Sequence, residues 1–166
     1  QEAAFLAEKY GADGTAARVA ALLHDCTKKL DMDRQLSLCR HYGIDLDPLE
    51  QVSLKLLHSK TGAAVARDKF GVSEEIYNAI YYHTTGKADM TFLEKIIYLA
   101  DYIEPSRRFP GVDELRRAVH TDLNEGLYRA LLDSVKELQG YGSPVHPHTR
   151  EALDSIRSEI GGTIHE

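Results

Sequence analysis

Three histidines and two aspartates recur along the chain at or beside the expected ends of helices. They are His24, Asp25, His58, His83 and Asp101. Imidazole and carboxylate groups without thiolates form the ligand set that holds one or two borderline divalent metal ions for phosphate-ester hydrolysis. A single His-Asp pair arises easily by chance in a chain with eight histidines. The prediction of a metal site therefore depends on the whole set.

Helix start and stop signals cover nearly the whole chain, and the sequence lacks the alternating pattern of strands. We therefore predict an all-α fold, with the candidate ligands carried on four different helices. The expected helices cover roughly residues 1–10, 16–23, 33–43, 47–58, 60–70, 73–83, 91–105, 113–120, 122–139 and 148–160.

Two of these helices carry clear start signals. Asp47 followed by Pro48 predicts the start of a helix that leads to His58. Thr91 and Glu94 have the spacing of a capping box. In the helix after Thr91, Asp101 falls on the margin of the apolar stripe, so we expect a partly buried carboxylate. Such a group needs a partner, which is either a metal ion, a salt bridge or a helix cap.

Length and composition describe one ordinary globular domain. The chain has 166 residues, of which 43% are hydrophobic and 28% are charged. A net charge of −6 disfavours a nucleic-acid-binding surface. No apolar run approaches the roughly 20 residues that cross a bilayer, and no signal-peptide pattern opens the chain. We therefore expect a cytoplasmic protein without membrane or nucleic-acid partners.

The segments around the candidate ligands strengthen the case. They are His24-Asp25-Cys26-Thr27-Lys28, His58-Ser59-Lys60-Thr61-Gly62-Ala63, Ile80-Tyr81-Tyr82-His83-Thr84, Leu93 to Pro105 and Arg107 to Val112. In this order the chain resembles the HD-domain metal-dependent phosphohydrolases. Within them it is similar to the YqeK-type family, the symmetrical diadenosine tetraphosphate hydrolases of bacteria. The resemblance covers nearly the whole chain.

The resemblance implies a single HD domain over residues 1–166, a helical bundle with the metal site between its helices. His24, Asp25, His58, His83 and Asp101 would bind two divalent ions, with Asp25 bridging them. Iron is the expected metal, with manganese, cobalt or zinc as alternatives. The implied reaction is hydrolysis of diadenosine tetraphosphate to two ADP by a metal-activated water. Asp25, Lys28 and Asp101 are the implied catalytic residues.

The same resemblance implies a nucleotide-binding surface. Besides Asp25 and Asp101, its residues would be Lys28, Thr84, Arg107, Pro144, Val145, His146, Pro147, His148 and Thr149. A guanidinium suits contact with phosphate oxygens, so Arg107 is the expected phosphate clamp. His146 and His148 lie between prolines, where ordinary turn chemistry competes with ligand contact.

One departure leaves alternatives open. The family pattern includes another histidine ahead of the His-Asp pair, and residues 1–23 contain none. We expect that the N-terminal part of the first helix is missing from this sequence. The alternatives are an HD phosphohydrolase acting on another nucleotide, or a nucleotide-binding regulatory module with an incomplete metal centre. A homodimer is also left open.

Overall fold

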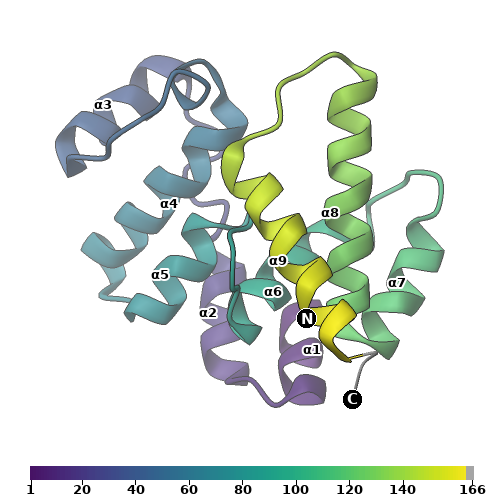
Figure 1. Cartoon of the computed structure of the whole chain (residues 1–166). Coiled ribbons are helices and arrows are strands. Elements are labelled where there is room, and N and C mark those ends of the chain that lie inside the picture. The colour runs from purple at the N-terminus through teal and green to yellow at the C-terminus, as the bar shows by residue number, and fades with distance from the viewer. Residues whose placement is uncertain (164–166) are drawn as a thin grey trace.

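Helices make up all of the regular secondary structure in residues 1–163, the part of the chain that this computed structural model describes (Figure 1). No strand occurs in that range, so the predicted all-α class is confirmed. Within the same residues, no helix is long and apolar enough to span a bilayer. In chain order the elements are α1 Glu2–Tyr10, α2 Gly14–Leu23, α3 Met32–Tyr42, the 3₁₀ turn η1 Glu50–Val52, α4 Leu54–Phe70, α5 Glu74–Tyr81, α6 Phe92–Tyr102, α7 Val112–Thr121, α8 Leu123–Gly140 and α9 Pro147–Thr163.

Helix α6 lies at the centre of the bundle, in contact with α1, α2, α5 and α8 (Figure 1). Its buried face carries Leu93, Ile96, Ile97 and Leu99, none of which is more than 2% exposed. Burying each such side chain contributes about 1.5–3 kcal/mol to folding. Because the core holds α6 on several sides, it also fixes the position of Asp101 near the C-terminal end of that helix.

Helix-capping contacts confirm several of the predicted helix starts. The Thr91 hydroxyl accepts a hydrogen bond from the Glu94 backbone N–H at 3.2 Å, and the Glu94 carboxylate accepts one from the Thr91 N–H at 2.8 Å. These two bonds complete the expected capping box. Ser73 caps α5 through the N–H of Ile76. Gly43 ends α3 in the left-handed conformation at φ 63°, where glycine is favoured.

The predicted division between residues 47–58 and 60–70 is wrong. Helix α4 is continuous from Leu54 to Phe70, and the side chain of Ser53 caps it. Asp47 does act as a cap, but its carboxylate accepts from the N–H groups of Leu49 and Glu50 and so starts only the short turn η1. His58 consequently lies inside the first half of α4 and not at a helix end.

Candidate metal centre

The His24-Asp25 pair lies in the turn that follows α2, and this turn is tied to α4. The hydroxyl of Thr27 donates a hydrogen bond to the His58 carbonyl at 2.9 Å. At Gly62 the two segments approach so closely that a Cβ would lie 3.3 Å from the His24 carbonyl oxygen. A side chain at position 62 would push the turn away, so glycine there lets α2 and α4 present their ligands to one point.

A buried polar network adds α3 to this support. The Gln35 side chain is fully buried, and its amide donates to the Thr27 carbonyl at 2.7 Å. The Gln35 amide oxygen in turn accepts from the hydroxyl of Thr61 on α4. Because every member of this network has a hydrogen-bond partner, it holds the turn rigidly without leaving an unpaired polar group.

Backbone carbonyls orient the histidine rings. Nδ1 of His24 lies 2.7 Å from the carbonyl oxygen of Ala21, and Nδ1 of His83 lies 2.6 Å from that of Ile80. The corresponding contact of His58 is longer, 3.4 Å. Since a carbonyl can only accept, Nδ1 carries the proton in His24 and His83, and their Nε2 atoms present lone pairs to the site. Metal-binding histidines are oriented in the same way.

The two oxygens of Asp25 face two different groups. Oδ1 lies 3.2 Å from Nε2 of His58 and 3.6 Å from Nε2 of His83. Oδ2 lies 3.5 Å from Nε2 of His24 and 2.7 Å from Nζ of Lys28. Asp25, His58 and His83 therefore form one group of converging ligand atoms.

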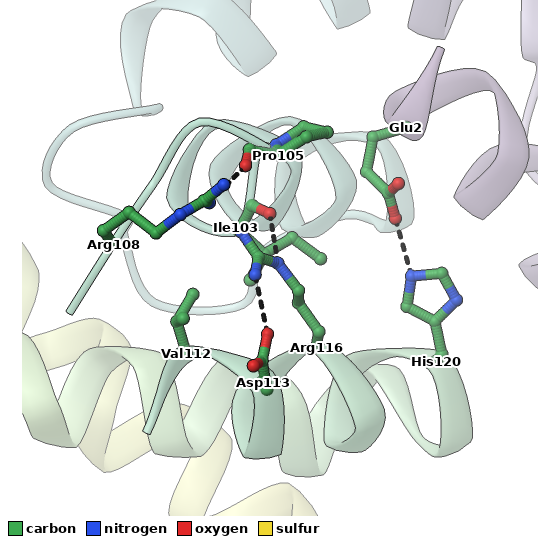
Figure 2. Close-up of a pocket in the computed structure, with 8 residues that line it drawn as sticks. All are labelled: Glu2, Ile103, Pro105, Arg108, Val112, Asp113, Arg116 and His120. Carbon is green, nitrogen blue, oxygen red and sulfur yellow. Dashed lines mark hydrogen bonds and ion pairs between the residues drawn. The ribbon is translucent and has the colours of Figure 1, made fainter. Parts of the chain in front are cut away.

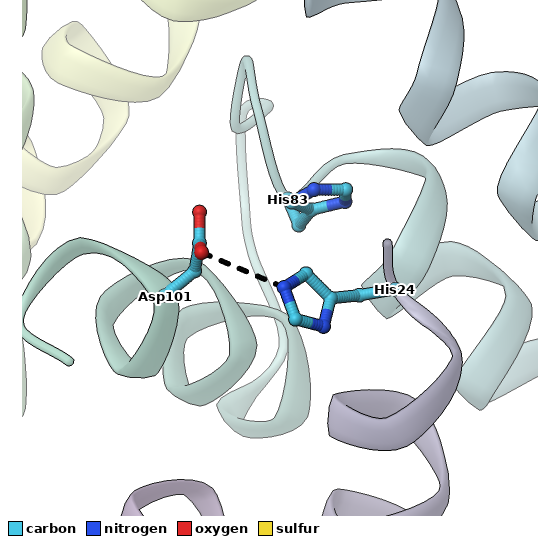
Figure 3. Close-up of side chains that lie close together, drawn as sticks. All are labelled: His24, His83 and Asp101. Atoms are coloured by element: carbon cyan, nitrogen blue, oxygen red, sulfur yellow. Dashed lines mark ion pairs between the residues drawn. The ribbon is translucent and has the colours of Figure 1, made fainter. Parts of the chain in front are cut away.

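His24, His83 and Asp101 form a second group (Figure 3). Oδ1 of Asp101 lies 3.5 Å from Nε2 of His24 and 3.3 Å from the Arg107 guanidinium. The Asp101 side chain is 24% exposed, which confirms the expected partial burial. The two groups share His83, so the five predicted metal ligands meet at one place.

The ligand atoms of the two groups are available to bind a cation. Among the described residues, Nε2 of His24 and Oδ1 of Asp25 are buried without a hydrogen-bond donor or acceptor. Nε2 of His58 and Nε2 of His83 lie 3.1 Å apart. Buried lone pairs left unsatisfied are costly, and a divalent ion satisfies several at once. The residues present therefore fit a divalent metal site.

The protonation states suit the same role. Burial alone would raise the pKa of Asp25, but the neighbouring His58, His83, Lys28 and His24 side chains hold it well below its usual range. Burial would also raise the pKa of Asp101, yet its contact with His24 and nearby positive charge lower that pKa to about 2. Burial lowers the pKa of His83. At neutral pH the site therefore contains two carboxylates and a neutral His83 ring.

An open pocket of about 770 Å³ leads to the candidate centre. Lys28 and Arg107 line it together with His24, Asp25 and Asp101, so two cations lie beside the candidate centre. Their side chains are 50% and 43% exposed. Glu104 and Ser106 also line the pocket and were not among the predicted site residues. Their position in the sequence between Asp101 and Arg107, two predicted site residues, could have indicated that they lie near the site.

The other predicted nucleotide-binding residues do not line this pocket. The hydroxyl of Thr84 lies 3.0 Å from that of Ser59, beside the buried His83. The ring of His148 packs edge-on to Tyr82 with the centroids 5.7 Å apart. The segment Pro144 to Thr149 therefore lies on the side of the centre formed by α4 and α5, away from Lys28 and Arg107.

A third group of potential ligands consists of Asp47, Glu50 and His146. Nε2 of His146 lies 3.1 Å from Glu50 and 3.2 Å from Asp47, while its Nδ1 accepts from the backbone N–H of His148. Nε2 must then carry the proton, so it has no lone pair for a metal. Nζ of Lys60, 2.6 Å from Glu50, already supplies the balancing positive charge. We interpret this group as a buried ion-pair network.

The helical bundle brings histidines and aspartates from α4, α6 and the turns after α2 and α5 to one centre, and this arrangement defines a class of hydrolases. The HD domain family model matches residues 2–106, and this chain belongs to that family. The matched range includes all five candidate ligands.

The similar proteins give the closer relationship. The chain is 40% identical to a symmetrical bis(5'-nucleosyl)-tetraphosphatase of Halalkalibacterium halodurans, over 93% of this chain and 82% of that protein. It is also 40% identical to the Bacillus subtilis protein of the same name, over 87% and 77%. A crystal structure from Clostridium acetobutylicum, described as a predicted HD superfamily hydrolase involved in NAD metabolism, superposes with a TM-score of 0.91 at 41% identity. The match covers 95% of this chain and 84% of that one. The resemblance to the YqeK-type family is confirmed, and the chain is a hydrolase of this kind.

Proposed function

We propose that this chain hydrolyses diadenosine tetraphosphate at its central phosphoanhydride bond and releases two ADP. The observation that carries the proposal is the convergence of two ligand groups that share His83, with Asp25 of one group also facing His24 of the other. The substrate class comes from two relatives, each 40% identical to this chain, that are named symmetrical bis(5'-nucleosyl)-tetraphosphatases.

We further propose that the centre holds two divalent ions, with iron as the first candidate. Asp25 is suited to bridge them because its two oxygens face different sets of histidines. Of the remaining ligands, His58 would belong to one ion and His24 with Asp101 to the other. When bound, such ions lower the pKa of water and neutralise charge on phosphate oxygens.

The protein's own residues would bind and orient the polyphosphate. Asp25 and Asp101 add negative charge that repels phosphate, and Lys28 and Arg107 offset it at the mouth of the pocket. The half-exposed Lys28 ammonium, which pairs with Asp25 at 2.7 Å, would also contact a phosphate oxygen as a point charge. Arg107 offers a planar pair of N–H donors that matches two oxygens of one phosphate.

The adenosine end would lie against the segment Pro144 to Thr149. Burial of the His146 ring against Glu50 holds this segment on the bundle. His148 and Tyr82 supply half-exposed ring surface beside Thr84. Aromatic rings of this kind suit contact with a nucleobase.

The test is product analysis with metal-loaded protein. Diadenosine tetraphosphate should be converted to ADP alone, and hydrolysis in ¹⁸O-labelled water should place one label in one of the two ADP molecules. Formation of AMP and ATP would show that a different bond is cut. Reconstitution with iron under anaerobic conditions, and separately with manganese, cobalt and zinc, identifies the active metal.

A second candidate is hydrolysis of another nucleotide, which the description of the Clostridium acetobutylicum structure favours. A panel of nucleoside monophosphates and dinucleotides, including NAD, distinguishes the two. Rapid cleavage of a panel member with no turnover of diadenosine tetraphosphate would favour this second candidate. Binding without any turnover would favour a regulatory module.

A further inference from the structure

The turn that leads from Asp101 to Arg107 begins at the C-terminal end of α6. The last carbonyl groups of a helix have no N–H partner within it, and here Pro105 removes one more donor from the turn. Within the turn, the Arg107 N–H donates to the Glu104 carbonyl at 2.9 Å. Arg108 donates within the turn to the carbonyls of Pro105 and Arg107. Further donors come from outside the turn.

Arg116, on α7, supplies those donors. Its Nε donates to the Ile103 carbonyl at 3.0 Å, and its Nη2 donates to the carbonyls of Glu104 and Arg107 at 2.9 and 3.2 Å. Nη1 donates to the Asp113 carboxylate at 2.8 Å. Figure 2 shows the guanidinium between Asp113 and Ile103. One planar side chain thus holds three carbonyls of a single turn.

The same turn ends at the candidate phosphate clamp. The Arg107 guanidinium donates through Nε to the Asp101 carbonyl at 3.2 Å and through Nη2 to the Asp101 carboxylate at 3.3 Å. A continuous series of contacts therefore runs from Arg116 through the Arg107 backbone to a candidate metal ligand.

We propose that Arg116 is a positioning residue, which holds the turn so that Arg107 faces the metal centre and the substrate phosphates. The inference rests on the proposed function. Arg116 itself lines a separate cavity of about 530 Å³, on the other side of Pro105, and does not line the metal pocket.

The ion pair with Asp113 does not by itself explain why an arginine is needed at position 116. Asp113 is 72% exposed, and an exposed ion pair of this kind is worth little. The carbonyl contacts are different, because they require several donors in one plane. A lysine has a single ammonium and cannot reproduce them. Arg116→Lys therefore removes the clamp and keeps the charge.

Arg117 provides the matched control. It is the next residue on α7, it is 71% exposed, and it pairs with Glu114 one turn away. Arg117→Lys makes the same chemical change on the same helix, at a side chain that pairs with Glu114 and not with the turn. Both variants are compared as full chains loaded with metal.

The first experiment is a double-mutant cycle on hydrolysis of diadenosine tetraphosphate. Arg116→Lys should lower kcat/KM about tenfold, mainly by raising KM, and should leave the metal content unchanged. Arg117→Lys should keep the kcat/KM of the wild type. Arg107→Ala should cause a similar loss, and adding Arg116→Lys to it should cost less than about twofold more. Losses that multiply in the double variant would overturn the inference. So would an Arg107→Ala variant with full activity, although that result leaves the proposed hydrolysis intact.

The second experiment does not depend on turnover. Trypsin cleaves after arginine, and Arg107 and Arg108 lie exposed in the turn. Arg116→Lys should increase cleavage after these two residues at least about fivefold relative to Arg117→Lys, because release of the turn lets it open locally. Equal cleavage in the two variants would overturn the inference. If the wild-type chain hydrolyses no dinucleotide, the proposed function fails and this comparison still decides whether Arg116 holds the turn.

Discussion

Nε2 of His58 and Nε2 of His83 lie 3.1 Å apart, and the Nδ1–H of His83 donates a hydrogen bond to the Ile80 carbonyl. Oδ1 of Asp25 lies within 3.6 Å of both nitrogens. Three potential ligand atoms from three separate segments therefore converge in a largely buried space. A divalent cation is the simplest common partner for them.

Replacement of Asp25 should abolish both metal binding and turnover, because its two oxygens face both ligand groups. For Asp25→Ala we expect less than one metal ion per chain and a fall in kcat of at least about a thousandfold. Metal analysis and steady-state kinetics check this. Asp33→Ala, at an exposed position on α3, is the control and should change neither value. Retention of both metal ions by Asp25→Ala would disprove the bridging role.

Replacement of Arg107 should separate substrate binding from metal binding. Arg107→Ala removes the guanidinium at the pocket mouth but no candidate ligand, so we expect KM to rise about tenfold at unchanged metal content. Metal analysis and a full dependence of rate on substrate concentration test this. Equal loss of metal and activity would mean that Arg107 supports Asp101 and does not act as a phosphate clamp.

The acid stability of the metal-free protein should depend on Asp101. Burial works against its ionisation, but contact with His24 and nearby positive charge hold the folded-state pKa at about 2, below the ordinary value of 3.8. The unfolded chain therefore binds the proton first as pH falls. The resulting stability, about 2 kcal/mol, is fully present above pH 3.8 and is lost as pH falls through the folded-state pKa.

Urea unfolding in the presence of EDTA tests this dependence. The difference in unfolding free energy between the wild type and Asp101→Asn should shrink as the pH is lowered from about 5 to about 3. Asp33→Asn should show no such trend. A difference that stays constant or grows toward acid pH would contradict the low pKa of Asp101.

The buried network around Glu50 should be needed for stability. Lys60 and Glu50 are 8% and 3% exposed and pair at 2.6 Å, so removing the lysine leaves a buried carboxylate with much less compensation. We expect Lys60→Met to destabilise the fold by about 3 kcal/mol. Lys55→Met, at an exposed position on the same helix, should change stability by less than about 0.5 kcal/mol.

The double variant Lys60→Met with Glu50→Gln completes this test. It removes both charges, so it should recover a large part of the stability that Lys60→Met loses. Urea unfolding at neutral pH compares the unfolding free energies of the wild type, Lys60→Met, Lys55→Met and the double variant. If Lys60→Met is no worse than Lys55→Met, the ion pair does not support the fold.

Local signals allowed most of the fold to be predicted. The capping box at Thr91 and the stop at Gly43 act within a few residues, so their effects can be read along the chain. The break expected near residue 59 was wrong because Asp47 and Ser53 offer competing starts. Residues 57–64 of α4 are buried on every side, so no single apolar stripe marks the helix as continuous.

The candidate ligands could be predicted because their residue types and neighbouring motifs resemble those of the HD-domain family. The supporting contacts could not. Arg116 and the turn it holds, or Glu50 and His146, meet only after the helices pack, and each residue alone has the sequence appearance of an ordinary surface charge or turn residue. Long-range pairings of this kind leave no periodic pattern in the sequence.

Metal titration of the apoprotein tests the central claim most directly. Iron(II) is added anaerobically to metal-free chain while bound metal and the rate of ADP formation from diadenosine tetraphosphate are followed together. We predict saturation at two metal ions per chain, with activity appearing as the sites fill. Saturation below one ion per chain, or an ADP-forming rate that does not respond to metal, would contradict the account.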